Sequence, residues 1–365
     1  MIYLDYQATT PLAPEAREAM LRWLGSEDGF ANPHSPHRPG RAAAAAVEVA
    51  REQVAALCPP GGRVIFTSGA TEAINLAIAG TRARHIAASA IEHAAVLDTA
   101  RAHADGLTLI PVGGDGVVDA ATRFVPGTDL VAVMQVNNEI GTIQPVDALA
   151  DAAHAAGALF LCDAVQGAGK IAAPARADLI AISAHKLYGP KGIGALWVRD
   201  GVEIVPLLHG GGQEGGLRSG TLSPALCAGF GAAAALCKAR WESDVQHVDS
   251  LWKTACATLL RPGSGWVLNG GPTRRWHGNL NLRRADDRGP LDVARLMSDL
   301  RDIAFSAGSA CASGSGRPSH VLSALGLSPA AAKSSIRIGF GRYTAQGEFA
   351  EAIARIDAAV AAQEG

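Results

Sequence analysis

A lysine and an acid follow two apolar runs of this sequence, and together they could support chemistry on an aldehyde. Lys186 follows the strand-like run 177–182, and Asp163 follows the run 158–162, with Gln166 three residues later. A lysine amine can bond to an aldehyde carbon, and an acid can keep a pyridinium nitrogen protonated so that the ring withdraws electrons. The pair predicts a site for pyridoxal 5'-phosphate. The alternative is a solvated lysine at a strand end, since lysine is seldom buried without a partner.

A tight turn earlier in the chain could cradle the phosphate of such a cofactor. Residues 63–67 are typical of a strand, 68–71 (Ser-Gly-Ala-Thr) of a turn, and 72–78 of a helix with apolar residues at helical spacing. Backbone N–H groups converge at a helix N-terminus and bind anions there. An ordinary capped connection is the alternative, because Ser and Thr are also good helix caps.

A cysteine supplies the third chemical group. Cys311 lies in the segment 305–316, which is rich in Gly, Ser and Ala. Such a segment buries little apolar surface and has low barriers to movement, which suits a nucleophile that travels between two positions. A linker with an idle thiol is the alternative, because reactivity also requires surroundings that favour the thiolate.

These residues belong to a series of short motifs, and the series resembles the pyridoxal phosphate-dependent cysteine desulfurases of the NifS and IscS type. The motifs span nearly the whole chain in the order of that family. They are 3–11 (YLDYQATTP), 31–35 (ANPHS), 66–72 (FTSGATE), 136–141 (VNNEIG), 183–192 (SAHKLYGPKG), 209–214 (HGGGQE), 218–221 (RSGT), 305–316 (FSAGSACASGSG) and 334–337 (SSIR).

The resemblance implies a role for each residue around the cofactor ring. Lys186 would bond to the aldehyde carbon, His93 would stack on the ring and help to move protons, and Asp163 would pair with the ring nitrogen. Gln166 would contact the ring hydroxyl, and Asn138 is also expected beside the cofactor. Taken singly, His93 is equally consistent with an ordinary hydrogen-bonded or surface histidine.

The resemblance also implies which residues bind the phosphate. From this chain they would be Ala70, Thr71, Ser183 and His185. Thr221 would reach the phosphate of a neighbouring subunit, which implies a homodimer.

The substrate would be bound by a further set of residues. Asn138 and Arg337 would hold its carboxylate, the arginine through the bidentate geometry that a carboxylate favours, and Asn32 would lie close by. A salt bridge is the alternative for Arg337. Cys311 would be the nucleophile that takes the sulfur and becomes a persulfide.

The implied activity is the conversion of L-cysteine to L-alanine, with the sulfur passed through Cys311 to an acceptor such as an iron–sulfur scaffold protein. Iron–sulfur cluster assembly is the leading destination for the sulfur, and nitrogenase maturation and tRNA thiolation are the alternatives. A class V aminotransferase or a selenocysteine lyase would share the fold and the cofactor but would not need the cysteine segment. A non-enzymatic scaffold is a remote alternative, because Lys186 and Cys311 are both present.

The order of apolar runs predicts an α/β fold with a mainly parallel seven-stranded sheet, since helical or loop segments separate the strands. The expected strands are 63–67, 85–89, 107–112, 130–136, 158–162, 177–182 and 193–198. Ligand residues of such sheets gather at the carboxyl ends of the strands.

A chain of 365 residues exceeds the usual single core, so two domains are expected. The resemblance implies a fold-type I pyridoxal phosphate-dependent transferase. Its large domain would span 13–245, and a smaller α+β domain, made of 1–12 and 246–365, would carry the cysteine segment.

Composition argues against several other partners. A net charge of −2 gives no general basic face for stable nucleic-acid or membrane binding, and no apolar run approaches the length of about 18 residues that a membrane span needs. His34 and His37 lack neighbouring ligands, so no permanent metal is predicted. The six cysteines form no C-x-x-C pair, and the first residues show no secretory pattern; a cytoplasmic protein with reduced thiols is therefore expected.

Overall fold

The computed structural model describes residues 1–25, 29–308 and 319–364 of the chain. Within these ranges, no helix has both the length and the apolar character that crossing a membrane requires.

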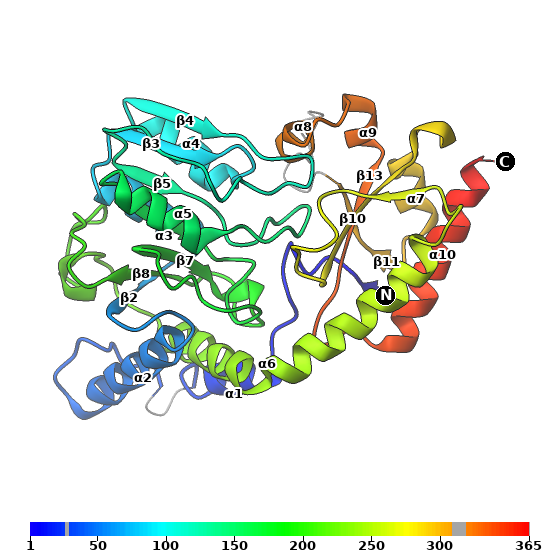
Figure 1. Ribbon diagram of the computed structural model, residues 1–365. Coiled ribbons are helices and arrows are strands. Elements are labelled where there is room, and N and C mark those ends of the chain that lie inside the picture. Colours follow the sequence, from blue (N-terminus) through cyan, green and yellow to red (C-terminus); the bar gives the residue numbers. More distant parts are fainter. Residues whose placement is uncertain (26–28, 309–318, 365) are drawn as a thin grey trace.

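A seven-stranded sheet forms the centre of the larger part of the molecule (Figure 1). In spatial order its strands are β2 (Gly62–Thr67), β8 (Gly194–Arg199), β7 (Leu179–Ser183), β6 (Leu159–Asp163), β5 (Leu130–Ala132), β3 (His85–Ser89) and β4 (Gly106–Ile110). Only β8 runs against its neighbours: it is antiparallel to both β2 and β7, while the other pairings are parallel. The predicted mainly parallel seven-stranded sheet is confirmed.

One strand is shorter than its apolar run predicts. The run continues to 136, but β5 ends at Ala132. Two residues later, the N–H of Met134 donates to the buried carboxylate of Glu92 at 2.7 Å. A side chain has thus replaced the next strand as the hydrogen-bond partner, and the ladder with β3 stops there.

Helices cover both faces of this sheet because successive strand residues point to opposite sides. Helices α3 (Ala70–Gly80) and α4 (Ala94–His103) share one buried cluster with strand residues such as Leu196. Helices α2 (Arg38–Ala55) and α5 (Val146–Ala155) share the other with residues such as Phe160 and Trp197. Helix α1 (Pro14–Leu21) also contributes to this second cluster.

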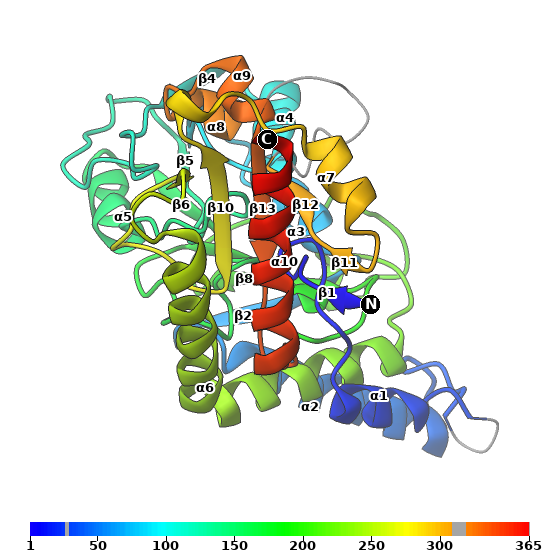
Figure 2. The same ribbon diagram turned by 90° about the vertical axis from the view of Figure 1, so that its right-hand side faces the viewer.

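A four-stranded antiparallel sheet forms the smaller part. Its order is β12 (Ser306–Ala307), β13 (Ser335–Gly339), β10 (Asn279–Arg284) and β9 (Trp266–Leu268). Figure 2 shows α10 (Gln346–Glu364) lying along β10 and β13, where Ile353 and Ile356 join the same buried cluster as Leu280 and Ile338. The shorter helices of this part are α7 (Val293–Asp299), α8 (His320–Ala324) and α9 (Pro329–Lys333).

The N-terminal residues pair with strands of this smaller part. Strand β1 (Ile2–Tyr3) pairs in parallel with β11 (Ile303–Ala304), and Asp5 forms a bridge with Gly339 at the end of β13. Residues 2–5 are thus fixed to strands that lie some 300 residues later in the sequence.

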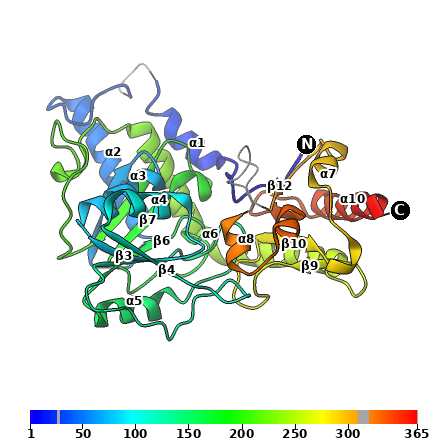
Figure 3. The ribbon, with the colours of Figure 1, turned by 90° about the horizontal axis from the view of Figure 1, so that it is seen from above.

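Helix α6 (Pro224–Leu259) joins the two parts (Figures 1 and 3). Its first half, with Phe230, is buried in the core of the large sheet, and its second half, with Leu251, is buried in the core of the small sheet. Gly231 lets α2 approach α6, because a Cβ there would lie 2.7 Å from the Cα of Ala50.

The predicted domain boundaries, 13–245 for the large domain and 1–12 with 246–365 for the small domain, stay a prediction.

Candidate active site

A cavity of about 550 Å³ lies at the carboxyl ends of the parallel strands, and Arg337 of β13 also lines it. It brings together most of the side chains that the sequence singled out. They are Ala70, Thr71, His93, Asn138, Asp163, Gln166, Ser183, His185, Lys186 and Arg337. The predicted gathering of ligand residues at the strand ends is therefore present in the fold.

Three predicted residues are not in this group. Asn32 and Thr221 are exposed and do not line the cavity of their own chain. The expected contact of Thr221 with a second subunit and the expected place of Asn32 near the substrate both stay predictions. Cys311 lies outside the described residues.

Asp163 is the acid of the site. It is the last residue of β6 and is only 6% exposed, and its Oδ1 accepts a hydrogen bond from the N–H of Val165 at 3.0 Å. Burial raises the pKa of Asp163, while that N–H and the charge of Lys186 favour the carboxylate. A buried acid in this position is stabilised as a carboxylate if a cation binds beside it. The protonated ring nitrogen of a pyridine is such a cation.

Lys186 ends a short 3-10 helix, η1 (Ala184–Lys186), that follows β7 directly. Its Nζ donates to the carbonyl oxygens of Gln7 and Ala8, the second at 2.8 Å. The N-terminal segment thus forms one wall of the cavity. No role was predicted for Gln7 and Ala8 from the sequence. Both lie in the motif 3–11, and the similarity of that motif to the family could have indicated that they are near the site.

The wall is fixed by contacts between the N-terminal segment and the residues around Lys186. Thr10 Oγ1 donates to the carbonyl oxygen of His185 and accepts from the N–H of Tyr188. His185 Nδ1 lies 3.1 Å from Thr9 Oγ1. Burial, followed by the charge of Lys186, lowers the pKa of His185 to about 4, so this imidazole is neutral at physiological pH.

The first turn of α3 faces the same cavity. Gly69 precedes the helix, and the backbone N–H groups of the first turn have no partner within the helix. Ala70, Thr71, Ser183 and His185 line this end. These donors and the positive end of the helix dipole fit a phosphate group.

His93 is the N-cap of α4, and its Nδ1 accepts from the N–H of Ala95 at 3.1 Å. This contact fixes the tautomer, since an accepting Nδ1 in a neutral imidazole leaves the proton on Nε2. The ring lines the cavity together with Asp163 and Lys186.

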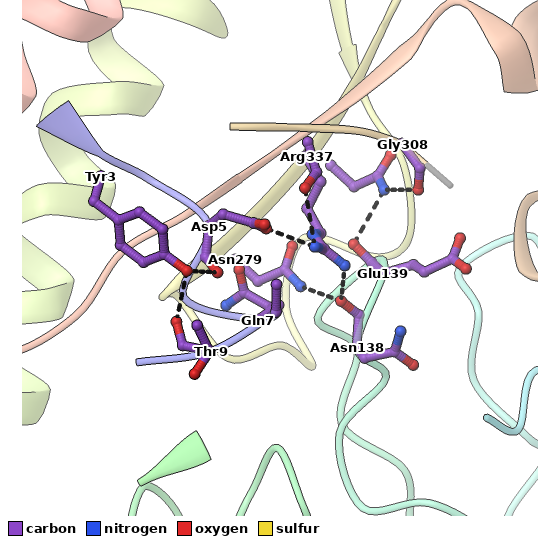
Figure 4. A network of polar contacts seen from close by, with 12 residues as sticks. Tyr3, Asp5, Gln7, Thr9, Asn138, Glu139, Asn279, Gly308 and Arg337 are labelled. Carbon is purple, nitrogen blue, oxygen red and sulfur yellow. Dashed lines mark hydrogen bonds and ion pairs between the residues drawn. The ribbon is translucent and has the colours of Figure 1, made fainter. Parts of the chain in front are cut away.

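A buried arginine also lines the cavity, and Figure 4 shows its polar contacts. Arg337 is 1% exposed, and its Nη1 donates to the backbone oxygen of Asn138 at 3.1 Å. Its Nη2 donates to Asp5 Oδ1 at 2.6 Å. Arg337 is thus in a salt bridge, which was the alternative, and it also lines the cavity; its binding of a substrate carboxylate stays a prediction.

The cysteines in the described ranges are poor candidates for the nucleophile. None of them lines the cavity, and burial raises the pKa of each thiol, to about 12 for Cys58 and Cys227. The five residues are Cys58, Cys162, Cys227, Cys237 and Cys256. A thiol that stays protonated is a weak nucleophile.

The donor set fits pyridoxal 5'-phosphate. One cavity contains an amine, a buried acid that requires a cation, and a helix N-terminus for an anion. Among the residues that the structure describes, no group of three or more His, Cys, Asp or Glu side chains is arranged to hold a metal ion.

The fold and this site define a pyridoxal phosphate-dependent enzyme of the α/β class. Residues 2–351 match the family model described as Aminotransferase class-V, and the chain belongs to that family. Within it, the chain belongs to the cysteine desulfurases, as its similarity to curated relatives shows.

Two of these relatives match almost from end to end. The mitosomal cysteine desulfurase of Encephalitozoon cuniculi is 44% identical over 94% of this chain and 83% of the relative. The cysteine desulfurase IscS of Rickettsia rickettsii is 43% identical over 95% of this chain and 88% of the relative.

Solved structures are similar in the same way. A NifS-like protein superposes with a TM-score of 0.87 at 31% identity, covering 99% of both chains. The protein SspA in complex with cysteine superposes with a TM-score of 0.78 at 34% identity, covering 94% of this chain and 100% of the other. The predicted fold class and family are confirmed.

Proposed function

We propose that this protein is a cysteine desulfurase that converts L-cysteine to L-alanine and transfers the sulfur to Cys311 as a persulfide. The observation that carries the proposal is the single cavity in which Lys186, Asp163 and Arg337 meet. The cysteine desulfurases among the relatives, and the neighbouring structure that contains cysteine, support this substrate.

The cavity residues divide the work. When bound, pyridoxal phosphate supplies an aldehyde for the substrate amine and a ring that withdraws electrons from the substrate. Lys186 would hold the cofactor and move a proton at the substrate α-carbon, and His93 is the second proton carrier beside it. Asp163 would keep the ring nitrogen charged, and Ala70, Thr71, Ser183 and His185 would hold the phosphate.

The substrate carboxylate fixes the orientation of the cysteine. Arg337 and Asn138 would bind it, and the substrate amine would lie near Lys186.

The sulfur transfer needs no added oxidant, because the electrons of the broken carbon–sulfur bond stay with the substrate carbon. The Cys311 thiolate attacks the substrate sulfur, a sulfur–sulfur bond forms, and the bond between that sulfur and the substrate β-carbon breaks. The β-carbon takes a proton, so the products are L-alanine and a persulfide on Cys311. Release of the outer sulfur as sulfide then needs a reductant or an acceptor.

The nearest alternative is a class V aminotransferase or a selenocysteine lyase. Neither requires a cysteine in a Gly- and Ser-rich segment, and the similar proteins named above favour desulfuration. The non-enzymatic scaffold receives no support from a cavity that retains its amine and its acid.

We also propose a subunit arrangement, a sulfur acceptor and a cellular location. The exposed Thr221 supports a homodimer in which it reaches the phosphate of the second subunit. An iron–sulfur scaffold protein is the proposed sulfur acceptor, with tRNA thiolation as the other destination. The five free cysteines of the described ranges are typical of a reducing compartment, which supports a cytoplasmic location.

An anaerobic assay with L-cysteine and a reductant tests the proposal. We expect equal amounts of alanine and sulfide from the purified protein and loss of both products with Cys311→Ser, which should keep the visible cofactor band. Cys256→Ser is the matched control and should retain activity. Alanine formed only from an amino donor with a keto acid would move the protein to the aminotransferases.

A further inference from the structure

The arginine that faces the cavity already has a carboxylate partner. Asp5 Oδ1 accepts from Nη2 of Arg337 at 2.6 Å, and the arginine side chain is 1% exposed (Figure 4). Ser306 Oγ is a long contact to the same nitrogen at 3.4 Å. Among the described residues, the buried Nε of Arg337 has no hydrogen-bond partner. A ligand carboxylate that accepts from Nε–H of Arg337 would therefore lie beside Nη2, which already donates to the Asp5 carboxylate.

Backbone contacts determine where the Asp5 carboxylate lies. Asp5 bridges to Gly339, two residues beyond Arg337 on β13. The carbonyl oxygen of Asp5 accepts from Tyr3 Oη at 3.1 Å and from the N–H of Ala8 at 2.9 Å. The backbone that carries the carboxylate is thus fixed at a strand edge, and the carboxylate lies beside the guanidinium.

The negative charge of Asp5 changes how strongly Arg337 attracts a ligand carboxylate. A carboxylate in contact with the guanidinium cancels much of the positive potential that it presents to the cavity, and it repels a second carboxylate directly. Burial raises the pKa of the Glu139 carboxyl, while a hydrogen bond from Ser319 and the charges of His320 and Arg337 favour its ionisation. The other basic residues that line the cavity with Arg337 are Lys186, Lys191, His93 and His185.

We infer that Asp5 weakens the binding of the α-carboxylate that substrate and product share, and that it thereby keeps L-alanine from occupying the site. The inference rests on the proposed function, because it assigns the ligand carboxylate to Arg337. Cysteine and alanine carry the same α-carboxylate, so Asp5 reduces the affinity for both. Because the same contact is present with substrate and with product, Asp5 lowers the affinity for L-cysteine and speeds the release of L-alanine by the same factor.

Asp5→Asn in the purified holoenzyme tests this role. The amide keeps the size of the side chain but removes its charge. We expect the KM for L-cysteine and the inhibition constant for L-alanine to fall together, on the order of tenfold for one like charge a few ångströms away. Inhibition by 2-aminoethanethiol, which has the amine and the thiol but no carboxylate, should not change.

The thermal stability of Asp5→Asn is a second measurement, and it should change in the direction opposite to the affinity for alanine. Asp5→Asn leaves a buried guanidinium without its counter-ion, so the thermal midpoint without ligand should fall while the affinity for alanine rises. A purely structural Asp5 would lower both the midpoint and the affinity. Asp302→Asn is the control, because it removes the exposed ion pair with Arg355, away from the cavity. If Asp5→Asn is not recovered as holoenzyme, Asp5→Ser takes its place.

The outcomes separate this inference from the proposed function. Unchanged or weaker alanine inhibition in Asp5→Asn would overturn the inference, as would an equal gain in affinity for 2-aminoethanethiol. If the wild-type protein forms no alanine from cysteine, the proposed function fails instead. The alanine affinity, read from the visible cofactor band, still reports whether Asp5 opposes a carboxylate.

Discussion

Lys186 Nζ donates a hydrogen bond to the carbonyl oxygen of Ala8 at 2.8 Å, across a separation of 178 residues. The lysine at the end of one strand of the large sheet therefore contacts a segment in which Asp5 bridges to Gly339 of the small sheet. The site is complete only when both parts of the chain are folded together.

Replacing this lysine should abolish turnover. Lys186→Ala removes the amine that would hold the cofactor and move a proton, so alanine formation should fall by at least about 10²-fold. Desalting should remove the visible cofactor band from this variant, whereas the wild-type protein should keep it. Lys253→Ala, on the exposed side of α6, is the control and should keep both band and activity.

The charge of Asp163 should matter more than its size. Asp163→Asn cannot compensate a protonated ring nitrogen, and we expect turnover to fall by about 10²–10³-fold with altered cofactor absorbance. Asp178→Asn is the matched control, a buried acid that accepts from the N–H of Phe160 and does not line the cavity. It should lower stability and leave the turnover of the folded enzyme in place. Equal losses of turnover in both variants would contradict a role for Asp163 at the cofactor.

Stability should fall as the pH rises towards 8 because of one buried acid. Burial raises the pKa of Glu92 to about 8, from an ordinary value of 4.5. Between those values the folded protein binds a proton that the unfolded chain has released, so the free energy of unfolding decreases with increasing pH. Urea unfolding of the holoenzyme between about pH 5 and 8 measures this slope.

Glu92→Gln stays uncharged at every pH and should flatten that slope. The variant should be more stable than the wild type at the alkaline end, where the wild-type carboxylate is buried with one oxygen lacking a partner among the described residues. Glu52→Gln, on the exposed side of α2, is the control. An unchanged slope in Glu92→Gln would assign the pH dependence to other groups.

A dimer contact at the phosphate should appear in cofactor affinity. Thr221→Val removes a hydroxyl while nearly keeping the side-chain shape, and the loss of one hydrogen bond to a charged phosphate should weaken cofactor binding by about tenfold or more. Equilibrium titration of pyridoxal phosphate measures this change. Thr108→Val, an exposed threonine of β4, is the control. If Thr221→Val binds the cofactor as tightly as the wild type, Thr221 does not reach the phosphate.

The sequence alone determined the order of the strands along the chain and the identity of ten residues that line the cavity. Apolar runs such as 158–162 and 177–182 mark strands because burial on both faces of a sheet demands apolar side chains along a short segment. Asp163 and Lys186 follow such runs, and strands that run parallel bring the ends of those runs to one edge. These are local signals, so they could be predicted without coordinates.

Only the tertiary structure decided the contacts between segments that are distant in the sequence. The antiparallel direction of β8, the early end of β5 at Glu92, and the N-terminal wall beside Lys186 have no local signal. The partner of Arg337 is the clearest case. The residue type predicts that a carboxylate binds there, but the presence of Asp5 depends on the bridge between residues 5 and 339, which forms when the chain folds.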